Sequence, residues 1–281
     1  MDTYAVTRRI LEQRLRRYTD TGPDLSPFGS ARFRRDGILL RVAYAVAHPG
    51  MAGPLVDRVL RYARLRGMRV QWVVVPQQSG EGELAPALAS ARFRLAEQLL
   101  LMAHAGPIAA PINPAVVITP ITRWDEMVAY EDGNRQAFFD EMTAAMGDVA
   151  MRARQRWQEQ ERGWCRYYVA SLGNGIIGGC YITSFEEIPT IMGVYTLDGA
   201  RRQGVATALL ARVIADTLSA RRPAQPVPTS LAASLAFVQP MSLRPDLCCL
   251  FVKHGNPAER LYRQLGFVPL VDELTFDWDV S

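Results

Sequence analysis

The sequence predicts a mixed α/β fold in two domains, and three observations lead to this expectation. The chain has 281 residues, more than one hydrophobic core usually holds. Apolar runs with strand character alternate twice along it with segments of helical periodicity. Between the two series, residues 106–114 (GPIAAPINP) cannot hold regular structure for long. We therefore expect domains at residues 1–110 and 115–281, the first smaller than the second.

The first series predicts a small α/β unit. Its opening segment places apolar side chains on one helical face and is followed by a loop rich in proline and glycine. The expected elements are a helix at 3–19, strand material at 32–44 with a turn at 35–37, a helix at 54–66, a strand at 70–75, a short helix at 84–91 and a strand or strand pair at 92–103.

The second series is longer and predicts a mixed central sheet flanked by helices. Its elements are strands at 116–119, 165–171, 176–183, 189–197 and 247–252, helices at 123–131, 135–161, 204–220 and 257–265, and final strands at 267–278. A tight turn at 173–175 joins two of the strands as a hairpin. Residues 221–246 contain five prolines and are expected to form a long insertion with one short helix.

Composition narrows the classes of function. Hydrophobic residues make up 49% and charged residues 21% of the chain, which is ordinary for a soluble globular enzyme. No apolar run reaches the roughly 18 residues that span a bilayer, and the start lacks the pattern of a secretion signal. We therefore expect a cytoplasmic protein with no membrane partner. The four cysteines and three histidines show no metal-ligand spacing, so we expect no metal site.

The net charge is +4, and nearly all of the positive charge is arginine. Arginines are densest from Arg8 to Arg17 and from Arg32 to Arg35, and the apolar neighbours of the first stretch fall on one helical face. This pattern is typical of the solvated face of an amphipathic helix. Contact with nucleic acid or with the phosphates of a cofactor is the alternative. Because the charge is diffuse, we do not expect nucleic acid as the partner.

The most informative segment follows the strand expected at 189–197, where a short turn leads into a helix at Gly204. The start of a helix exposes unpaired N–H groups and the positive end of the dipole, which together bind phosphate. A glycine lets the backbone approach closely, and arginines add charge-assisted contacts. The expected phosphate-binding residues are Arg201, Arg202, Gln203, Gly204, Val205, Ala206 and Thr207.

This segment resembles the pyrophosphate loop of the GNAT (Gcn5-related N-acetyltransferase) superfamily. The family pattern is Arg/Gln-x-x-Gly-x-Gly/Ala, and Arg201, Gly204 and Ala206 fill its positions. The setting strengthens the resemblance, because the segment follows an apolar strand and opens an amphipathic helix. The P-loop and dinucleotide-binding patterns are not matched.

A second resemblance lies near the end of the chain. Residues 256–267 (NPAERLYRQLGF) are similar to the closing motif of the family, N-x-x-A-x-x-L-Y-x-x-L-G-F. Asn256 is one residue closer to Ala258 than in the family pattern, so a helix N-cap competes with a cofactor contact as its role. Pro257 and Glu259 suit the first turn of that helix, as in a capping box. The resemblance covers roughly residues 116–281 and implies a GNAT fold.

The resemblance implies an acetyl-CoA-dependent N-acetyltransferase, in which an amine attacks the thioester directly. It implies that Val194, Tyr195 and Thr196 pair their backbone with the pantetheine arm of acetyl-CoA. Splaying of this strand from the one at 247–252 would open the slot for the thioester. Tyr262 matches the family tyrosine that protonates the departing thiolate; a core tyrosine is the alternative. Glu187 is the candidate general base, with Glu186 and His254 as other candidates; a surface carboxylate is the alternative role for Glu187.

The first half repeats part of the same pattern but lacks the arginine and glycine spacing of the phosphate loop. We interpret it as a truncated GNAT-like domain that does not bind CoA; an unrelated small α/β domain is the alternative. For the whole chain, a non-catalytic acyl-CoA-binding or scaffold protein is the alternative to an enzyme. The acceptor is expected to be a small-molecule or peptide amine, and a homodimer stays open.

Overall fold

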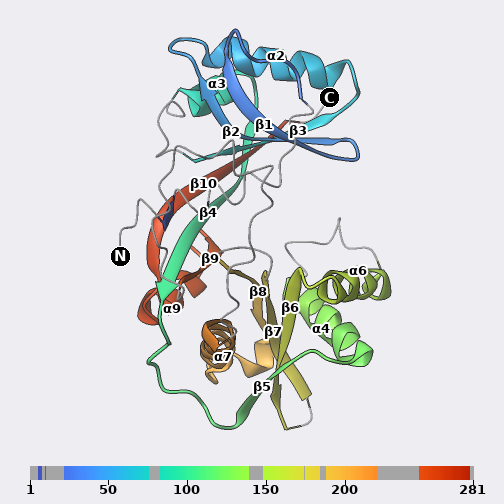
Figure 1. Cartoon of the computed structure of the whole chain (residues 1–281), viewed down its shortest axis with the longest axis vertical. Helices are drawn as coiled ribbons and strands as arrows, with labels where there is room; N and C mark the ends of the chain where they lie inside the picture. The colour runs from blue at the N-terminus through green and yellow to red at the C-terminus, as the bar shows by residue number, and fades with distance from the viewer. Residues whose placement is uncertain are drawn as a thin grey trace, which may run out of the picture. The chain divides into compact units, whose positions relative to one another are not determined.

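The computed structural model describes residues 6, 7, 10, 22–75, 83–138, 148–173, 175–183, 188–219 and 247–278. The chain forms two compact units, both visible in Figure 1. The first unit comprises residues 1–102, 251–263 and 268–281, and the second comprises residues 103–250 and 264–267. Within the described ranges, no helix is long and apolar enough to cross a membrane.

In the first unit, helices α2 and α3 cover one side of a sheet with the strand order β1-β2-β3-β10-β4 (Figure 1). Strands β1 and β2 form an antiparallel hairpin, β2 and β3 run parallel, and β10 lies antiparallel to β3. The bounds are β1 Gly29–Asp36, β2 Leu39–Ala47, α2 Ala52–Arg64, β3 Arg69–Val74, α3 Leu84–Ser90, β4 Arg94–Ala105, α9 Ala258–Gln264 and β10 Val268–Trp278.

The core of the first unit lies between this sheet and α2. The helix buries an apolar stripe that includes Leu55, Val59 and Ala63, as its 3.6-residue periodicity predicts. Trp72 of β3 is fully buried in the same cluster, and its register partner is Phe276 of the last strand. The end of the chain therefore completes the core of its first part.

The second unit has the strand order β9-β8-β7-β6-β5. Strands β5 to β8 are antiparallel neighbours, and β8 runs parallel to β9. Helices α4 and α6 cover one face of this sheet and α7 the other (Figure 1). The bounds are β5 Val116–Pro120, α4 Trp124–Ala137, α6 Val149–Glu161, β6 Cys165–Leu172, β7 Gly175–Thr183, β8 Thr190–Thr196, the 3-10 turn η1 Asp198–Ala200, α7 Val205–Ser219 and β9 Leu247–Lys253.

Over the described residues the predicted alternation of strands and helices is confirmed, except in the helical region between β5 and β6. Separate helices at 123–131 and 135–161 are expected there, but α4 runs as one helix from Trp124 to Ala137 and a second helix, α6, begins at Val149. Asp148 caps that second helix, since its carboxylate accepts the backbone N–H of Ala150 at 3.2 Å. Residues 139–147, the expected helix at 3–19 (apart from residues 6, 7 and 10) and the insertion at 221–246 lie outside the described residues.

Candidate functional site

One edge of β8 is the first feature of the candidate site. Thr190 and Ile191 register with Cys249 and Leu250 of β9. From Met192 onward, no registered partner is described on that side, whereas β7 pairs with the other side up to Thr196. Backbone N–H and C=O groups along this edge can therefore pair with an extended ligand, as an added strand would.

A bulge marks the point where β8 leaves β9. Tyr181 of β7 faces Met192, and Gly179 faces Tyr195. On β7, only Cys180 lies between Gly179 and Tyr181. On β8, two residues, Gly193 and Val194, lie between the partners Met192 and Tyr195, so β8 has one extra residue. Gly193 has φ +58°, a conformation that glycine adopts without strain.

Of the three β8 residues expected to contact the cofactor, Tyr195 turns its side chain away from solvent. It is 3% exposed, and its hydroxyl donates to the backbone carbonyl of Tyr130 in α4 at 3.0 Å. Only its main chain is therefore available at the strand edge. Val194 and Thr196 are half-buried. The role of these three residues as cofactor contacts stays a prediction.

The turn after β8 has the backbone shape that a phosphate-binding loop requires. Arg202 has φ +64° and Gly204 has φ +79°, and alternation of this kind turns successive N–H groups toward one side. The glycine adopts its angle freely, whereas a left-handed arginine costs on the order of 1 kcal/mol. Arg201 pairs with Asp198 at 2.8 Å (Nη2 to Oδ1), and both side chains are exposed.

Helix α7 begins directly after this turn. Its first intrahelical bond runs from the N–H of Ala208 to the carbonyl of Gly204 at 2.9 Å. The N–H groups of Val205, Ala206 and Thr207 precede that bond and have no acceptor within the helix. Together with the dipole of a helix of 15 residues, they form an anion-binding terminus.

The turn is held from both sides by side-chain hydrogen bonds. Gln203 donates through Nε2 to the carbonyl of Gly199 at 3.1 Å. Asn113, in the segment before β5, donates through Nδ2 to the carbonyl of Gln203 at 2.9 Å. Asn113 lies in the linker expected at 106–114, and nothing local in the sequence connects it to a turn 90 residues later.

Buried tyrosines fill the space between β7, β8 and α4. Tyr130 packs edge-on against Tyr195 and against Tyr167 of β6, with ring centroids 5.6 and 5.4 Å away. A Cβ at Gly179 would lie 2.8 Å from the rings of Tyr130 and Tyr195. The absent side chain at this position of β7 therefore lets both rings approach the sheet. Burial raises the pKa of all three hydroxyls above the ordinary tyrosine value, so each stays protonated.

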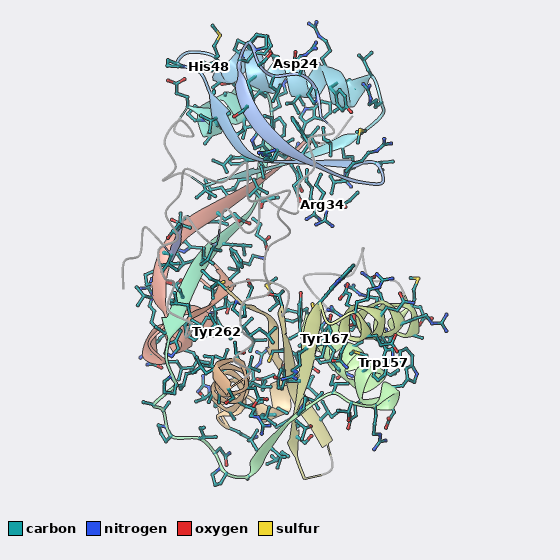
Figure 2. All side chains as sticks on the ribbon, viewed as in Figure 1. Asp24, Arg34, His48, Trp157, Tyr167 and Tyr262 are labelled. Carbon is teal, nitrogen blue, oxygen red and sulfur yellow. The ribbon has the colours of Figure 1, made fainter. Side chains whose placement is uncertain are left out.

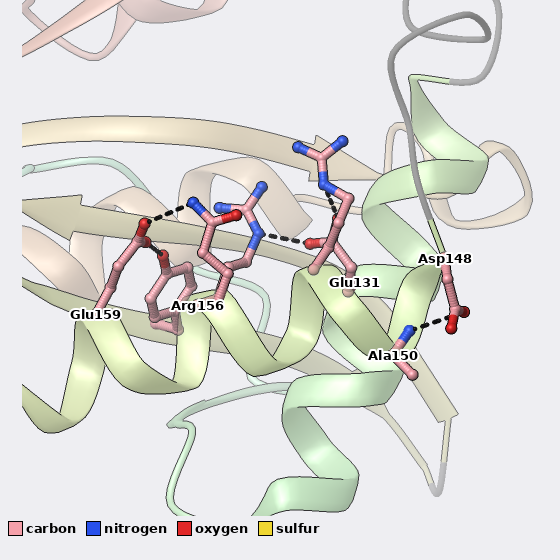
Figure 3. Close-up of polar contacts among 8 residues, drawn as sticks. Glu131, Asp148, Ala150, Arg156 and Glu159 are labelled. Carbon is pink, nitrogen blue, oxygen red and sulfur yellow. Dashed lines mark hydrogen bonds and ion pairs between the residues drawn. The ribbon is translucent and has the colours of Figure 1, made fainter. Parts of the chain in front are cut away.

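An ion-pair network joins α4 to α6 beside these rings, as Figure 3 shows. Glu131 is 1% exposed and pairs with Arg156 at 2.6 Å and Arg152 at 3.1 Å. The guanidinium of Arg156 also lies over the rings of Tyr130 and Tyr167. A carboxylate in the core requires such partners, since an isolated buried charge is costly. The network therefore fixes α4 against α6.

The closing motif forms helix α9 in the first unit. Asn256 accepts the N–H of Ala258 through Oδ1 at 2.9 Å, so its capping role is confirmed. The expected capping box is wrong, because Glu259 pairs with Arg263 at 2.8 Å and the N–H of Asn256 donates to the Lys253 carbonyl. Tyr262, labelled in Figure 2, lies on α9 and is 6% exposed. Its acid role and a cofactor contact for Asn256 stay predictions.

Two further expectations concern the base and a metal. Glu187, the candidate base, lies outside the described residues. Among the residues that the structure describes, no group of three or more His, Cys, Asp or Glu side chains could hold a metal ion.

The family model described as an acetyltransferase (GNAT) domain matches residues 163–269. This range contains the bulged strand, the arginine–glycine turn, α7 and the closing helix. Over this range the chain therefore matches an acetyltransferase (GNAT) domain. No curated protein sequence matches the chain.

Solved structures support the fold over the whole chain. A GCN5-related N-acetyltransferase from Kribbella flavida superposes with a TM-score of 0.62 at 12% identity, covering 100% of this chain and 96% of that one. A GCN5-related N-acetyltransferase from Sphaerobacter thermophilus superposes with a TM-score of 0.62 at 16% identity, covering 88% of this chain and 75% of that one. A tandem GNAT protein from the clavulanic acid biosynthesis pathway, solved without acetyl-CoA, superposes with a TM-score of 0.56 at 14% identity. The match covers 96% of this chain and 94% of that one. The chain thus has the GNAT fold predicted from its two motifs.

Proposed function

We propose that the chain is an acetyl-CoA-dependent N-acetyltransferase that transfers an acetyl group to an amine. The observation that carries the proposal is the turn at 201–204 between the free edge of β8 and the start of α7. It combines a glycine at φ +79°, an arginine at φ +64° and the unpaired N–H groups of a helix terminus. This donor set matches a pyrophosphate, and the edge of β8 matches the amide-containing arm that joins it to the thioester.

The chain's own groups supply the steps around the thioester. The turn and α7 bind the pyrophosphate, and the main chain of Val194–Thr196 orients the arm. In this proposal Tyr262 gives a proton to the departing thiolate, and Glu187 accepts a proton from the amine. The acceptor class is a small-molecule or peptide amine, as expected from the sequence.

The proposal is tested by thiol release. The full chain is incubated with acetyl-CoA and a panel of small amines, polyamines, aminoglycosides and peptides, and free thiol is measured with a chromogenic disulfide. The proposal expects release that depends on at least one amine, and Tyr262→Phe should lower it by roughly 100-fold with unchanged acetyl-CoA affinity. Binding without turnover on any amine would favour the acyl-CoA-binding alternative instead.

A further inference from the structure

The hydroxyl of Tyr130 is a buried donor with no hydrogen-bond partner among the described residues. The whole side chain is 0% exposed. Leaving such a group unpaired in the core is destabilising, so its presence requires an explanation. The neighbouring tyrosines differ in this respect, because Tyr195 donates to a backbone carbonyl at 3.0 Å and Tyr167 to Glu159 at 2.8 Å.

The unpaired hydroxyl lies at the β8 bulge. A Cβ built on Gly193 would be 3.5 Å from the Tyr130 oxygen and 3.3 Å from the ring of Tyr181. Gly193 is itself partly exposed, and because it has no side chain the Tyr130 hydroxyl lies beside the backbone of the bulge. The bulge also lies where the registered pairing of β8 with β9 ends.

The packing around Tyr130 fixes the direction of this hydroxyl. Its ring lies over Gly179, where a Cβ would come within 2.8 Å, and its edges contact Tyr167 and Tyr195. The guanidinium of Arg156 lies 5.8 Å from the ring centroid. Rotating the ring away from the bulge would break these contacts. The donor is therefore preorganised.

We propose that the Tyr130 hydroxyl donates a hydrogen bond to the carbonyl oxygen of the acyl thioester at the β8 bulge. This inference rests on the proposed function and adds to it a residue that contacts the reacting group. Burial raises the pKa of Tyr130 well above its ordinary value, so the group is a neutral donor and not a base.

The step balances without a proton from Tyr130. The amine nitrogen forms a bond to the carbonyl carbon, and the carbonyl electron pair moves to oxygen, where the Tyr130 O–H stabilises it. The oxygen electron pair then re-forms the C=O bond while the C–S bond breaks with its electron pair on sulfur, and the sulfur takes up one proton. The nitrogen gives up one proton, and Tyr130 keeps its own throughout.

The test compares acetyl-CoA with CoA, because CoA lacks the carbonyl that Tyr130 would contact. Both are titrated by calorimetry into the wild-type chain and the Tyr130→Phe variant. The proposal expects the variant to bind acetyl-CoA roughly three- to ten-fold more weakly and CoA with unchanged affinity. The melting temperature of the ligand-free variant should be equal or higher, since an unpaired buried hydroxyl has been removed.

Tyr168→Phe is the matched control. Its hydroxyl donates to Asp216 on the α7 side of the sheet at 3.2 Å, so the substitution removes a satisfied bond away from the bulge. It should leave the preference for acetyl-CoA over CoA unchanged. Infrared spectra of acetyl-CoA labelled with ¹³C at the carbonyl give a second measurement, in which the bound carbonyl stretch should lie lower in the wild type than in Tyr130→Phe.

The outcomes separate this inference from the proposed function. Equal loss of acetyl-CoA and CoA affinity, or no loss of either, would overturn the role of Tyr130 and leave the acetyltransferase proposal standing. Failure of the folded wild-type chain to bind either compound would overturn both.

Discussion

Asn113 donates a hydrogen bond through Nδ2 to the backbone carbonyl of Gln203 at 2.9 Å, and so ties the segment before β5 to the turn that opens α7. The same side chain accepts the N–H of Ala115 through Oδ1 at 3.0 Å. A Cβ built on Gly204 would lie 3.4 Å from the Cβ of Asn113. The turn is therefore supported by a residue that is distant in sequence.

This support predicts that Asn113→Ala weakens acetyl-CoA binding about three- to ten-fold, the worth of one lost hydrogen bond. Thermal stability should change little, because the bond is exposed. Asn113→Asp keeps the acceptor for Ala115 but brings a negative charge to the turn. It should bind more weakly than the alanine variant at low salt, and the difference should shrink as salt increases. Calorimetry over a salt series checks this; equal affinity in all three proteins would contradict it.

Asp198 competes with the cofactor for Arg201 in the proposed site. The ion pair at 2.8 Å joins two exposed side chains, so it contributes little to stability. We predict that Asp198→Asn raises acetyl-CoA affinity about two- to three-fold, because it removes a negative charge beside the pyrophosphate and releases the guanidinium. Asp36→Asn, at an exposed pair in the first unit, is the control that should leave affinity unchanged. Weaker binding by Asp198→Asn would show that the pair positions Arg201 instead.

Glu131 is predicted to be a determinant of stability. Its carboxylate is the partner of two guanidinium groups, and Arg156 is only 15% exposed. Glu131→Ala should lower the free energy of unfolding by about 3–5 kcal/mol, because a buried arginine loses its partner. Glu126→Ala, on the first turn of the same helix, should cost about 1 kcal/mol, because the Glu126 carboxylate accepts the N–H groups of Thr122 and Arg123. Urea unfolding of both variants measures the difference, and similar values would contradict the account.

The buried tyrosines predict loss of stability at alkaline pH. Burial raises the pKa of Tyr130, Tyr167 and Tyr195, and that of Tyr168 to about 12. The unfolded chain ionises its tyrosines near pH 10, so the contribution of the neutral tyrosines to the free energy of unfolding is fully present below that pH. This contribution is lost as the pH rises toward the pKa values of the folded state. Absorbance at 295 nm should therefore rise in two stages, the second together with the loss of far-UV circular dichroism. A single stage with the fold retained would contradict this prediction.

Much of the fold could be predicted because its signals are local. The turn at 201–204 and the helix that follows it are encoded by adjacent residues, as is the cap at Asn256. The pairing of β10 with β3 joins residues about 200 positions apart, and no short pattern specifies it. Helix 135–161 was predicted as one element because its periodicity hid the capping signal of Asp148.

The candidate site divides in the same way. The turn at 201–204 can be predicted from its own glycine and arginines, whereas the hydrogen bond of Asn113 and the unpaired hydroxyl of Tyr130 arise from tertiary contacts. Gly178, Gly179 and Gly193 offered a signal, since glycines inside strands often mark a bulge or a close approach. A Cβ at Gly178 would lie 2.7 Å from the Tyr195 carbonyl oxygen, which explains why two of these glycines are adjacent.

The most direct test of the account is a calorimetric titration of acetyl-CoA into the wild-type chain and two glutamate variants. Gly204→Glu puts bulk and negative charge into the phosphate turn, and Gly53→Glu puts the same side chain at an exposed glycine of α2 with open space around it. Circular dichroism confirms that each variant is folded. One-site binding is expected for the wild type and for Gly53→Glu, and no binding for Gly204→Glu. Equal binding by folded Gly204→Glu, or no binding by the folded wild type, would contradict it.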